Sequence, residues 1–389
     1  MRICFSSDQS FPPLGGEGVS TENFCVRLSQ RNHRVTVLTS KAKNIPLVKE
    51  IRIYRFFTFH FPIAKNYLAF PAFKKVVSVL KKEKIEIIQI NESSYLGWQS
   101  SKAARKLNIP VVIGFHSQVG NIFPFYAPFF IKKLIELWFS YFFKKGDLVI
   151  APSHFAARLC QKYTDEPIQV VSNGVDLKKF NLGRVSSEDE RRFRERYVLR
   201  DSSLLLYAGR LSYEKNLSYL LRIMQALSKK KKGIKLLIVG EGILKKDLEK
   251  KVKKTGMTEE VVIAGYLGGK DLLCAYFCAD IFILPSFCEL QSIATMEAMA
   301  MKTTVLVARN EGNAAQELVK EGINGYTFGL EDTGEVVDKI IRILSDKELK
   351  RTMKEESFKA IQEHNIEESI SKLEKIYESL INQRIAGSV

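Results

Sequence analysis

The chain has 389 residues, of which 46% are hydrophobic and 26% are charged, a composition that excludes a disordered or fibrous protein. The length excludes one small module and predicts about two domains, each with its own core. The net charge of +17 is uneven, since residues 1–180 carry 26 Lys and Arg against 12 Asp and Glu, and such a field attracts nucleic acid, anionic membranes or phosphorylated substrates alike.

Short apolar runs alternate with helix-sized segments along the chain, which predicts parallel sheets flanked by helices. In the first half the expected strands are Met1–Ser7, Arg34–Thr39, Ile85–Ile90, Val111–Phe115 and Leu148–Ala151. A second series follows, with a helix over Lys215–Lys229 and strands at Leu204–Ala208, Lys235–Val239, Val261–Ala264, Ile281–Leu284 and Thr304–Val307.

This repeated pattern predicts an α/β fold with two Rossmann-like domains. The polar and charged stretch Asn181–Arg200 is the expected boundary. The N-terminal domain then covers residues 1–180 and the C-terminal domain residues 181–365, while residues from about 366 to 389 are expected to form an amphipathic helix.

Compartment is indicated by the N-terminal sequence and the cysteines. The chain begins with MRICFSS, which lacks the apolar core of a signal peptide, and no apolar run is long enough to cross a bilayer. The six cysteines have no CxxC spacing and do not cluster with the five histidines. We therefore expect a cytoplasmic protein with reduced thiols.

Glycines and cations follow the first strand of each series. Gly15 and Gly16 precede a helix expected near Ser20, and the free N–H groups of a helix start suit an anion or a sugar, although a plain tight turn would use the same glycines. In the second series, Arg210 and Lys215 follow a strand, so both cations are expected at the ligand end of the sheet, where they could neutralise a diphosphate. Ordinary surface cations are the alternative.

Two carboxylates lie eight residues apart after the strand Ile281–Leu284. Glu289 falls in a loop, and Glu297 lies about two turns inside an otherwise apolar helix. A carboxylate in such surroundings is costly unless it meets hydroxyls or amides, which a bound ribose would supply. A satisfied structural glutamate is the alternative.

In order and spacing, these stretches resemble the retaining GT-B glycosyltransferases of family 4 type, which carry a Glu-x7-Glu signature, and among them the enzymes that glycosylate diacylglycerol. The resemblance covers nearly the whole chain and implies two domains facing across a cleft, with the C-terminal helix returning to the N-terminal domain. It rests on Gly15-Gly16, Arg31-Asn32-His33-Arg34-Val35, His116, Asn173-Gly174-Val175-Asp176, Gly209-Arg210 with Lys215, Gly240-Glu241-Gly242, and Glu289 to Glu297.

The resemblance implies a role for each matching residue. Arg210 and Lys215 would hold the donor diphosphate. Glu297 would bind the ribose, while Glu289 and His116 would contact the transferred sugar; apart from Glu297, we expect all of these to be catalytic. The further donor contacts expected are Gly15, Gly16, Gly240, Gly265, Tyr266, Leu267, Gln291, Ser292 and Ile293.

The chemistry of sugar transfer fits these residue types. Breaking the bond to a nucleoside diphosphate builds negative charge on the leaving group, which preorganised cations stabilise. In the family the departing phosphate takes the acceptor's proton on the same face, so neither glutamate is assigned as a nucleophile. No apolar-flanked Asp-x-Asp follows a strand, and we expect transfer without a metal ion or other cofactor.

Two loops depart from the family pattern. Ser292 lies in the first glutamate loop, where a glycine is common, and Glu311–Glu317 lacks the paired glycines and the proline of many relatives. The identity of the donor sugar therefore stays open, although we expect a UDP-sugar such as UDP-glucose.

Aromatic residues and lysines are concentrated in two segments of the basic first half, residues 67–84 and 123–145. Such a mixture suits the interface of an anionic bilayer, so we expect a membrane lipid acceptor such as diacylglycerol and peripheral attachment to the inner face of the membrane. A helix that packs in the core, with its lysines reaching water, is the alternative. The expected membrane and acceptor contacts are Phe123, Phe125, Tyr126, Lys132, Lys133, Trp138, Lys74 and Lys75.

The predicted function is therefore retaining transfer of a hexose from a nucleotide sugar to a membrane lipid. The first alternative is the same chemistry on a soluble or polysaccharide acceptor. The second is a basic nucleic-acid-binding protein, but the sequence has no recognisable nucleic-acid module, so we expect no nucleic-acid partner.

Overall fold

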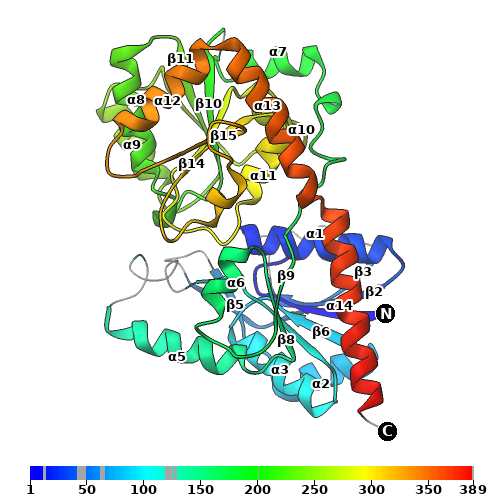
Figure 1. Ribbon diagram of the computed structural model, residues 1–389. Helices are drawn as coiled ribbons and strands as arrows, with labels where there is room; N and C mark the ends of the chain where they lie inside the picture. The colour runs from blue at the N-terminus through cyan, green and yellow to red at the C-terminus, as the bar shows by residue number, and fades with distance from the viewer. Residues whose placement is uncertain are drawn as a thin grey trace. The chain divides into compact units, whose positions relative to one another are not determined.

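The computed structural model describes residues 1–11, 15–41, 50–61, 66–118, 125, 129–199 and 201–387. The chain forms two compact units, each built around a parallel sheet (Figure 1). Unit 1 comprises Met1–Asn173 and Glu367–Val389, and unit 2 comprises Gly174–Ile366. The predicted α/β fold with two Rossmann-like domains is confirmed.

Unit 1 contains β1 (Arg2–Ser6), β2 (Arg34–Ser40), β3 (Ile51–Phe56), β4 (Thr58–Phe61), β5 (Asn66–Ala69), β6 (Ile87–Ile90), β7 (Val111–Gly114), β8 (Leu148–Ala151) and β9 (Ile168–Val170). Seven of these strands form one sheet in the order β3-β2-β1-β6-β7-β8-β9, and β4 and β5 form a separate antiparallel hairpin. The central strands β6, β7 and β8 are buried along their whole length, as expected for parallel strands covered on both faces.

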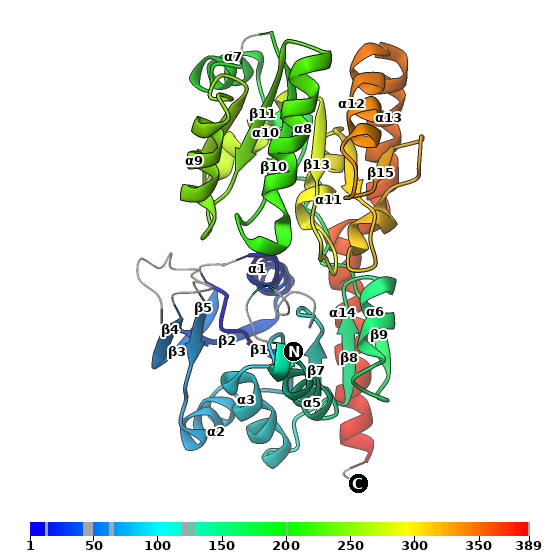
Figure 2. The same cartoon turned by 90° about the vertical axis from the view of Figure 1, so that its left-hand side faces the viewer.

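The helices of unit 1 are α1 (Gly16–Gln30), α2 (Phe73–Lys82), α3 (Tyr95–Lys106), α5 (Lys132–Phe143), α6 (His154–Cys160) and α14 (Ile366–Ala386), with a 3₁₀ turn η1 (Phe129–Ile131) before α5. Helices α2 and α3 lie side by side (Figure 2). On α2 the apolar side is buried through Val76, Val79 and Leu80, so its lysines remain at the surface.

The C-terminal helix α14 belongs to unit 1, as the family resemblance implies. Arg31, which follows α1, forms ion pairs with Glu367 at 2.8 Å and with Glu374 at 2.7 Å. The buried hydroxyl of Tyr377 donates a hydrogen bond to Gln89 Oε1 on β6. Helix α14 is therefore attached to the unit by charged groups at its start and by a buried polar group further along.

From Gln89, buried hydrogen bonds continue to the start of α1. Gln89 Nε2 donates to Asn91 Oδ1 at 2.7 Å, Asn91 Nδ2 donates to Thr21 Oγ1 at 2.6 Å, and Thr21 donates to Glu17 Oε1 at 2.8 Å. Because each link fixes the orientation of the next group, this chain of side chains holds the first turn of α1 against the sheet.

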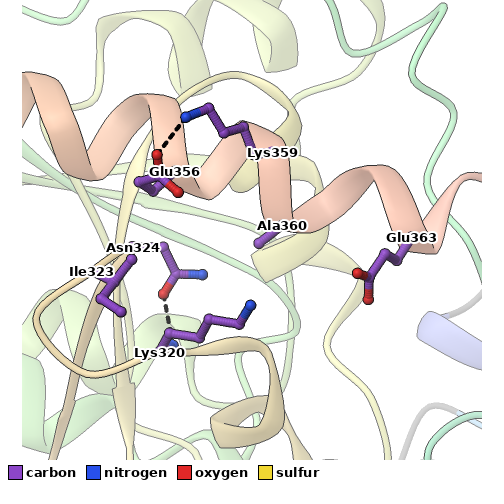
Figure 3. A pocket seen from close by; sticks show the side chains of 7 residues that line it. All are labelled: Lys320, Ile323, Asn324, Glu356, Lys359, Ala360 and Glu363. Atoms are coloured by element: carbon purple, nitrogen blue, oxygen red, sulfur yellow. Dashed lines mark hydrogen bonds and ion pairs between the residues drawn. The ribbon is translucent and has the colours of Figure 1, made fainter.

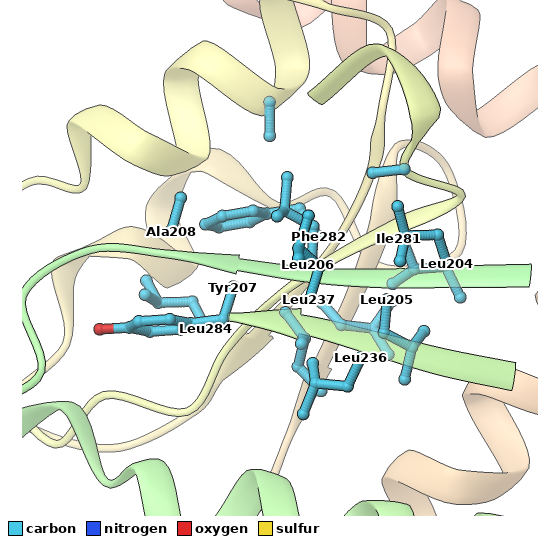
Figure 4. Close-up of a cluster of buried hydrophobic side chains, with 14 of the residues drawn as sticks. Leu204, Leu205, Leu206, Tyr207, Ala208, Leu236, Leu237, Ile281, Phe282 and Leu284 are labelled. Atoms are coloured by element: carbon cyan, nitrogen blue, oxygen red, sulfur yellow. The ribbon is translucent and has the colours of Figure 1, made fainter. Parts of the chain in front are cut away.

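Unit 2 contains β10 (Ser203–Ala208), β11 (Ile234–Val239), β12 (Val261–Gly265), β13 (Ile281–Leu284), β14 (Thr304–Ala308) and β15 (Gly325–Phe328). They form one parallel sheet in the order β12-β11-β10-β13-β14-β15. Leucines, Phe282 and other large side chains of β10, β11 and β13 meet in the core of the unit (Figure 4).

The helices of unit 2 are α7 (Ser187–Arg196), α8 (Leu217–Lys230), α9 (Lys245–Lys254), α10 (Gly269–Cys278), α11 (Ile293–Ala300), α12 (Gly334–Ser345) and α13 (Lys347–Ile361). Shorter 3₁₀ segments are η2 (Leu182–Arg184), η3 (Tyr213–Lys215), η4 (Ala314–Leu318) and η5 (Gln362–His364). Helices α12 and α13 pack side by side (Figures 1 and 2).

The strands predicted from the sequence lie where expected, but the sequence analysis does not identify β3, β9, β15 or the β4–β5 hairpin. Strands β3, β9 and β15 lie at the edges of the two sheets. An edge strand needs no continuous apolar run, and β3 places Arg52 and Arg55 between apolar residues. The apolar-run criterion therefore finds every central strand and the edge strand β12, but it misses the other edge strands.

The division between the units lies between Asn173 and Gly174 rather than at residue 180. Val175 is already bonded into unit 2, because its N–H donates to His364 O at 2.8 Å. The polar stretch Asn181–Arg200 is part of unit 2, since it contains α7, which buries Phe193 in the core. Its polarity reflects a solvated helix with one apolar contact and not a linker.

Candidate active site

The loop after β10 carries both residues predicted to hold a diphosphate. Arg210 is fixed through its backbone, because the buried Tyr207 hydroxyl donates to Arg210 O at 2.8 Å. Its half-exposed guanidinium lies 3.7 Å from Glu214 Oε1. Lys215 lies in η3, before the start of α8, and its enclosed Nζ donates to Glu289 Oε1 at 2.8 Å. The structure therefore brings Lys215 and Glu289, which are distant in sequence, into direct contact.

Glycines of the neighbouring loops support this arrangement. A Cβ on Gly240 would lie 1.8 Å from Gly209 O, so only glycine allows the loops after β10 and β11 to approach this closely. The Gly240 N–H donates to Gly265 O at 2.8 Å. Among the predicted donor contacts after β12, Leu267 is buried and Tyr266 is 77% exposed, so the Tyr266 ring is the one available to a ligand at the surface.

Glu289 itself is almost enclosed, with 9% of its surface exposed. After Gln291, Ser292 is the N-cap of α11, because its Oγ accepts the Thr295 N–H at 3.2 Å. Serine thus fulfils a capping role at the position where relatives commonly have glycine. Helix α11 begins at Ile293, and the positive end of its dipole lies at these predicted donor contacts.

The carboxyl group of Glu297 is enclosed one turn into α11 and not two turns as predicted, because the helix begins only at Ile293. The Tyr276 hydroxyl on α10 donates to Glu297 Oε2 at 2.7 Å. Burial raises the pKa of Glu297 to about 7, against the opposing effects of the Tyr276 hydrogen bond and the positive charge of Lys179. The sequence analysis does not identify Tyr276, because a tyrosine within an apolar helix gives no sign of its partner.

In unit 1, the predicted residues lie at the carboxyl ends of the strands. Helix α1 begins at Gly16, earlier than predicted, after Gly15 with a φ of 104°. Apart from its chain neighbours and the backbone of its own helix, no described atom lies within 4 Å of the position that a Cβ on Gly16 would take. His116 follows β7, and its buried Nε2 has no hydrogen-bond partner among the residues that the structure describes. Burial lowers the pKa of His116 to about 4, so the imidazole is uncharged at neutral pH.

Three carboxyl groups at the same edge are absent from the predicted set, one on a buried residue and two on half-buried residues. Asp8 follows β1, Glu17 lies in the first turn of α1, and Glu92 follows β6. The Asp8 N–H donates to Glu92 Oε2 at 2.6 Å. Burial raises the pKa of Asp8 to about 6 and that of Glu17 to about 7, and it raises the pKa of Glu92 well above its usual range. Asp8 and Glu92 lie two residues after a strand, and Glu17 directly follows Gly16. These positions are the sequence signal that could have identified the three residues.

Helix α5 presents apolar side chains both inward and outward. Phe139, Phe142 and Phe143 are buried, which agrees with the alternative that the helix packs in the core. The α5 outer face consists of the exposed Phe130, Leu134, Leu137, Trp138 and Tyr141, which range from 36% to 78% exposed. The core packing therefore accounts for only part of the aromatic segment.

The α5 outer face continues onto α3. The Trp138 indole N–H donates to Ser93 O at 2.7 Å, next to the start of α3. The exposed ring of Tyr95 on α3 lies 5.3 Å from that of Phe70. These residues extend the predicted surface, and neither Tyr95 nor the exposed Phe57 and Phe59 is among the predicted contacts.

The remaining predicted membrane contacts are placed as follows. Lys74, Lys75 and Lys133 are exposed, and Lys132 and Phe125 are half-buried. Phe123 and Tyr126 lie outside the described residues.

A cavity of about 230 Å³ lies elsewhere in unit 2, between the turn before β15 and α13 (Figure 3). Its lining includes Lys320, Asn324, Glu356 and Lys359, and Glu356 and Lys359 are paired with each other. None of the predicted donor contacts lines this cavity.

Within the described ranges, no group of three or more His, Cys, Asp or Glu side chains is arranged to hold a metal ion. No helix in the described part of the chain is both long and apolar enough to cross a bilayer.

Comparisons with known families match both units. The family described as glycosyl transferases group 1 matches residues 189–360, and glycosyltransferase family 4 matches residues 14–179. Alpha-monoglucosyldiacylglycerol synthase of Streptococcus pneumoniae is 26% identical, over 80% of this chain and 71% of that protein. The enzyme of the same name from Acholeplasma laidlawii is 22% identical, over 98% of both chains.

Solved structures share the fold. The Anabaena protein HepE, crystallised with UDP-glucose, matches with a TM-score of 0.79 at 20% identity, over 97% of this chain and 100% of that chain. Sucrose-phosphate synthase of Thermosynechococcus elongatus matches with a TM-score of 0.80 at 18% identity, over 98% of this chain and 100% of that chain. The predicted GT-B fold is confirmed.

Proposed function

Since the chain belongs to the glycosyltransferases that the group 1 and family 4 models describe, we propose that it transfers a hexose from a UDP-sugar to a membrane lipid such as diacylglycerol, with retention of configuration. The observation that carries this proposal is the pairing of Lys215 with Glu289 at 2.8 Å, beside the half-exposed Arg210. This pairing supports the proposal because a cation that can bind phosphate lies beside a carboxylate that can bind sugar hydroxyls.

The two cations differ in how they would meet the diphosphate. The ammonium group of Lys215 has three N–H donors, so it can bind a phosphate oxygen and keep Glu289. Arg210 is only loosely paired, at 3.7 Å from Glu214, and its planar guanidinium can bind two phosphate oxygens at once. Glu289 then has its remaining oxygen positions for hydroxyls of the sugar.

The transfer step needs no protein nucleophile. As the bond from the anomeric carbon to the diphosphate oxygen breaks, negative charge grows on the leaving oxygen, and Arg210 and Lys215 stabilise it. The leaving phosphate takes the proton of the acceptor hydroxyl, whose oxygen forms the new bond on the same face of the sugar. Because these cations neutralise the diphosphate, we propose that transfer needs no metal ion.

Glu297 would bind the ribose in its ionised form. Its carboxylate can accept hydrogen bonds from two neighbouring hydroxyls, while Tyr276 holds Oε2 from the other side at 2.7 Å. Such hydroxyls would also relieve the cost of burying this charge.

A lipid acceptor is supported by the relatives and by the surface of unit 1. Two similar enzymes are named as alpha-monoglucosyldiacylglycerol synthases. The α5 outer face exposes large aromatic and aliphatic side chains, and Lys133 on the same helix is exposed with them. An apolar face with surrounding lysines fits the interface of an anionic bilayer. We therefore place the protein peripherally on the cytoplasmic face of the membrane.

The test is a set of radiolabelled UDP- and GDP-sugars incubated with the full chain in EDTA, with and without diacylglycerol vesicles. The proposal predicts that label from a UDP-hexose enters the organic phase only when vesicles are present. It also predicts that the anomeric carbon of the product has the same configuration as in the donor. Nucleotide release stimulated only by a soluble glycan would instead establish the same chemistry on a soluble acceptor. Transfer that requires added Mg²⁺ would refute metal independence.

A further inference from the structure

The loop between β14 and η4 runs alongside the loop of Glu289. The Glu289 N–H donates to Gly312 O at 2.9 Å, and Glu289 O accepts the Ala314 N–H at 2.8 Å. Glu289 and Asn313 thus form a two-sided parallel bridge. The backbone position of Glu289 therefore depends on this second loop, which like the Glu289 loop departs from the family pattern.

Asn313 holds this second loop in place. It is fully buried, and its Nδ2 donates to Ala308 O at 2.8 Å and to Ser286 O at 3.3 Å. Its Oδ1 accepts the Ala315 N–H at 3.0 Å. One side chain thereby connects the end of β14, the segment after β13 and the start of η4.

The two loops also contact each other closely at Asn310 and Gly312. Asn310 Nδ2 donates to Ser286 O at 3.1 Å, and Asn310 Oδ1 accepts the Gly312 N–H at 2.8 Å. A Cβ on Gly312 would lie 2.4 Å from Phe287 O, so this position requires glycine for the close approach. The geometry between the loops is therefore tightly specified by Asn310, Gly312 and Asn313.

From these contacts we infer that Asn313 is a positioning residue for the Glu289 carboxylate and, through it, a determinant of which hexose the enzyme transfers. The inference rests on the proposed function, in which Glu289 contacts the hydroxyls of the sugar. The nucleoside end of the donor depends on other contacts, because Glu297 lies on α11 and is held by Tyr276. A disturbance at Asn313 should therefore change sugar selection and leave nucleotide binding intact.

The experiment compares Asn313→Ala with the wild-type full chain. Affinity for UDP alone is measured by calorimetry, and kcat/KM is measured with UDP-glucose and UDP-galactose. We expect kcat/KM for the preferred sugar to fall about ten- to a hundred-fold, mainly through kcat, because Glu289 moves away from the productive position. We expect the preference between the two epimers to shrink, while the UDP dissociation constant stays unchanged.

Asn324→Ala is the matched control. Asn324 is also fully buried in unit 2, and it donates to Leu318 O at 2.9 Å and accepts the Lys320 N–H at 2.8 Å. It should lower the melting temperature to a similar extent without changing the preference between epimers. If Asn313→Ala does not fold, Asn310→Ala, at a half-buried position of the same loop, must show the same separation of effects.

Three outcomes would overturn the inference: an unchanged kcat and epimer preference in Asn313→Ala, a parallel loss of UDP affinity, or the same change of preference in Asn324→Ala. If the wild-type chain transfers sugar from no nucleotide donor, the proposed function itself fails, and this inference fails with it.

Discussion

The carboxyl ends of the two sheets have opposite electrostatic character. In unit 1, the carboxyl groups of Asp8, Glu17 and Glu92 lie together, and burial raises the pKa of each. In unit 2, the equivalent edge carries Arg210 and Lys215, and Lys215 is paired with Glu289 at 2.8 Å. The carboxyl edge of the unit 1 sheet thus gathers acidic groups, whereas the carboxyl edge of the unit 2 sheet pairs a cation with a carboxylate.

Under the proposed function, this difference separates the groups that meet the diphosphate from those that meet hydroxyls. The cations of unit 2 attract the diphosphate. The edge of unit 1, with its uncharged His116 and its carboxyl groups of raised pKa, can form hydrogen bonds with hydroxyl groups of the sugar and of the acceptor. The positive charge of unit 1 lies at its surface, for example at Lys74 and Lys75, where an anionic bilayer can approach.

The largest effect is expected from removing the charge of Lys215 in unit 2. Lys215→Ala should lower kcat for transfer from UDP-glucose about 10²- to 10³-fold, since a preorganised charge at the leaving group is lost. Binding to diacylglycerol vesicles that contain anionic lipid should be unchanged, because the α5 outer face is intact.

Lys350→Ala supplies the control for this prediction. Lys350 on α13 is also partly enclosed, and it pairs with Asp280 at 2.9 Å. Asp280 directly precedes β13, so this pair lies at the opposite end of the strand from Glu289. It should retain full transfer activity. Normal turnover in Lys215→Ala would show that the diphosphate is held elsewhere.

The next effect concerns the surface of unit 1. Replacing Leu134 and Leu137 by Asp should weaken vesicle binding at least about tenfold, because two exposed apolar contacts become charges that an anionic bilayer repels. UDP affinity should not change. Ile323→Asp, at an equally exposed apolar position in unit 2, should leave vesicle sedimentation as in the wild type, and a similar loss there would argue for a nonspecific effect.

A smaller effect is expected from pH through Glu297. If the ribose requires the ionised carboxylate, kcat/KM for UDP-glucose should rise about tenfold between pH 6 and pH 8, because the pKa of Glu297 is about 7. Tyr276→Phe should move the midpoint of this profile upward, since the hydrogen bond from Tyr276 lowers the pKa. A flat profile, or a downward shift in that variant, would contradict the assignment.

The smallest effect concerns the stability of the carboxyl edge of unit 1. Because the pKa of Glu17 is raised to about 7, the folded chain holds more protons than the unfolded chain between about pH 4.5 and pH 7, and the free energy of unfolding falls as pH rises through that window. Glu17→Gln should therefore stabilise the protein at pH 8, by at most about 3 kcal/mol, and have little effect at pH 4. Urea unfolding at the two pH values measures this, and equal effects at both would argue against the shift.

Much of the fold could be predicted because central parallel strands such as β8 and β13 read as continuous apolar runs. Edge strands other than β12 escape this criterion: β3 carries Arg52 and Arg55, and β9 is half-exposed. The unit boundary lies earlier than predicted because a polar sequence can form a linker or a solvated helix. The signals that mark α7 as a helix of unit 2 are the Ser186–Asp189 capping box and the buried Phe193.

The candidate site was predictable where residue type and strand position coincide, as for Lys215 and Glu289. The pairing between them was not, because it depends on how two loops distant in sequence fold toward each other. Asn313 and Tyr276 gave no signal, since an amide or a phenol acquires its role only through its partners in space.

The most direct test of this division of roles is hydrogen–deuterium exchange of the full chain with UDP and, separately, with anionic diacylglycerol vesicles. The account predicts that UDP slows exchange in residues 209–216 and 286–297 of unit 2, while vesicles slow exchange in residues 130–143 of unit 1. If UDP left both segments of unit 2 unchanged, or if vesicles protected unit 2 and not α5, the assignment of donor and membrane to these two units would be wrong.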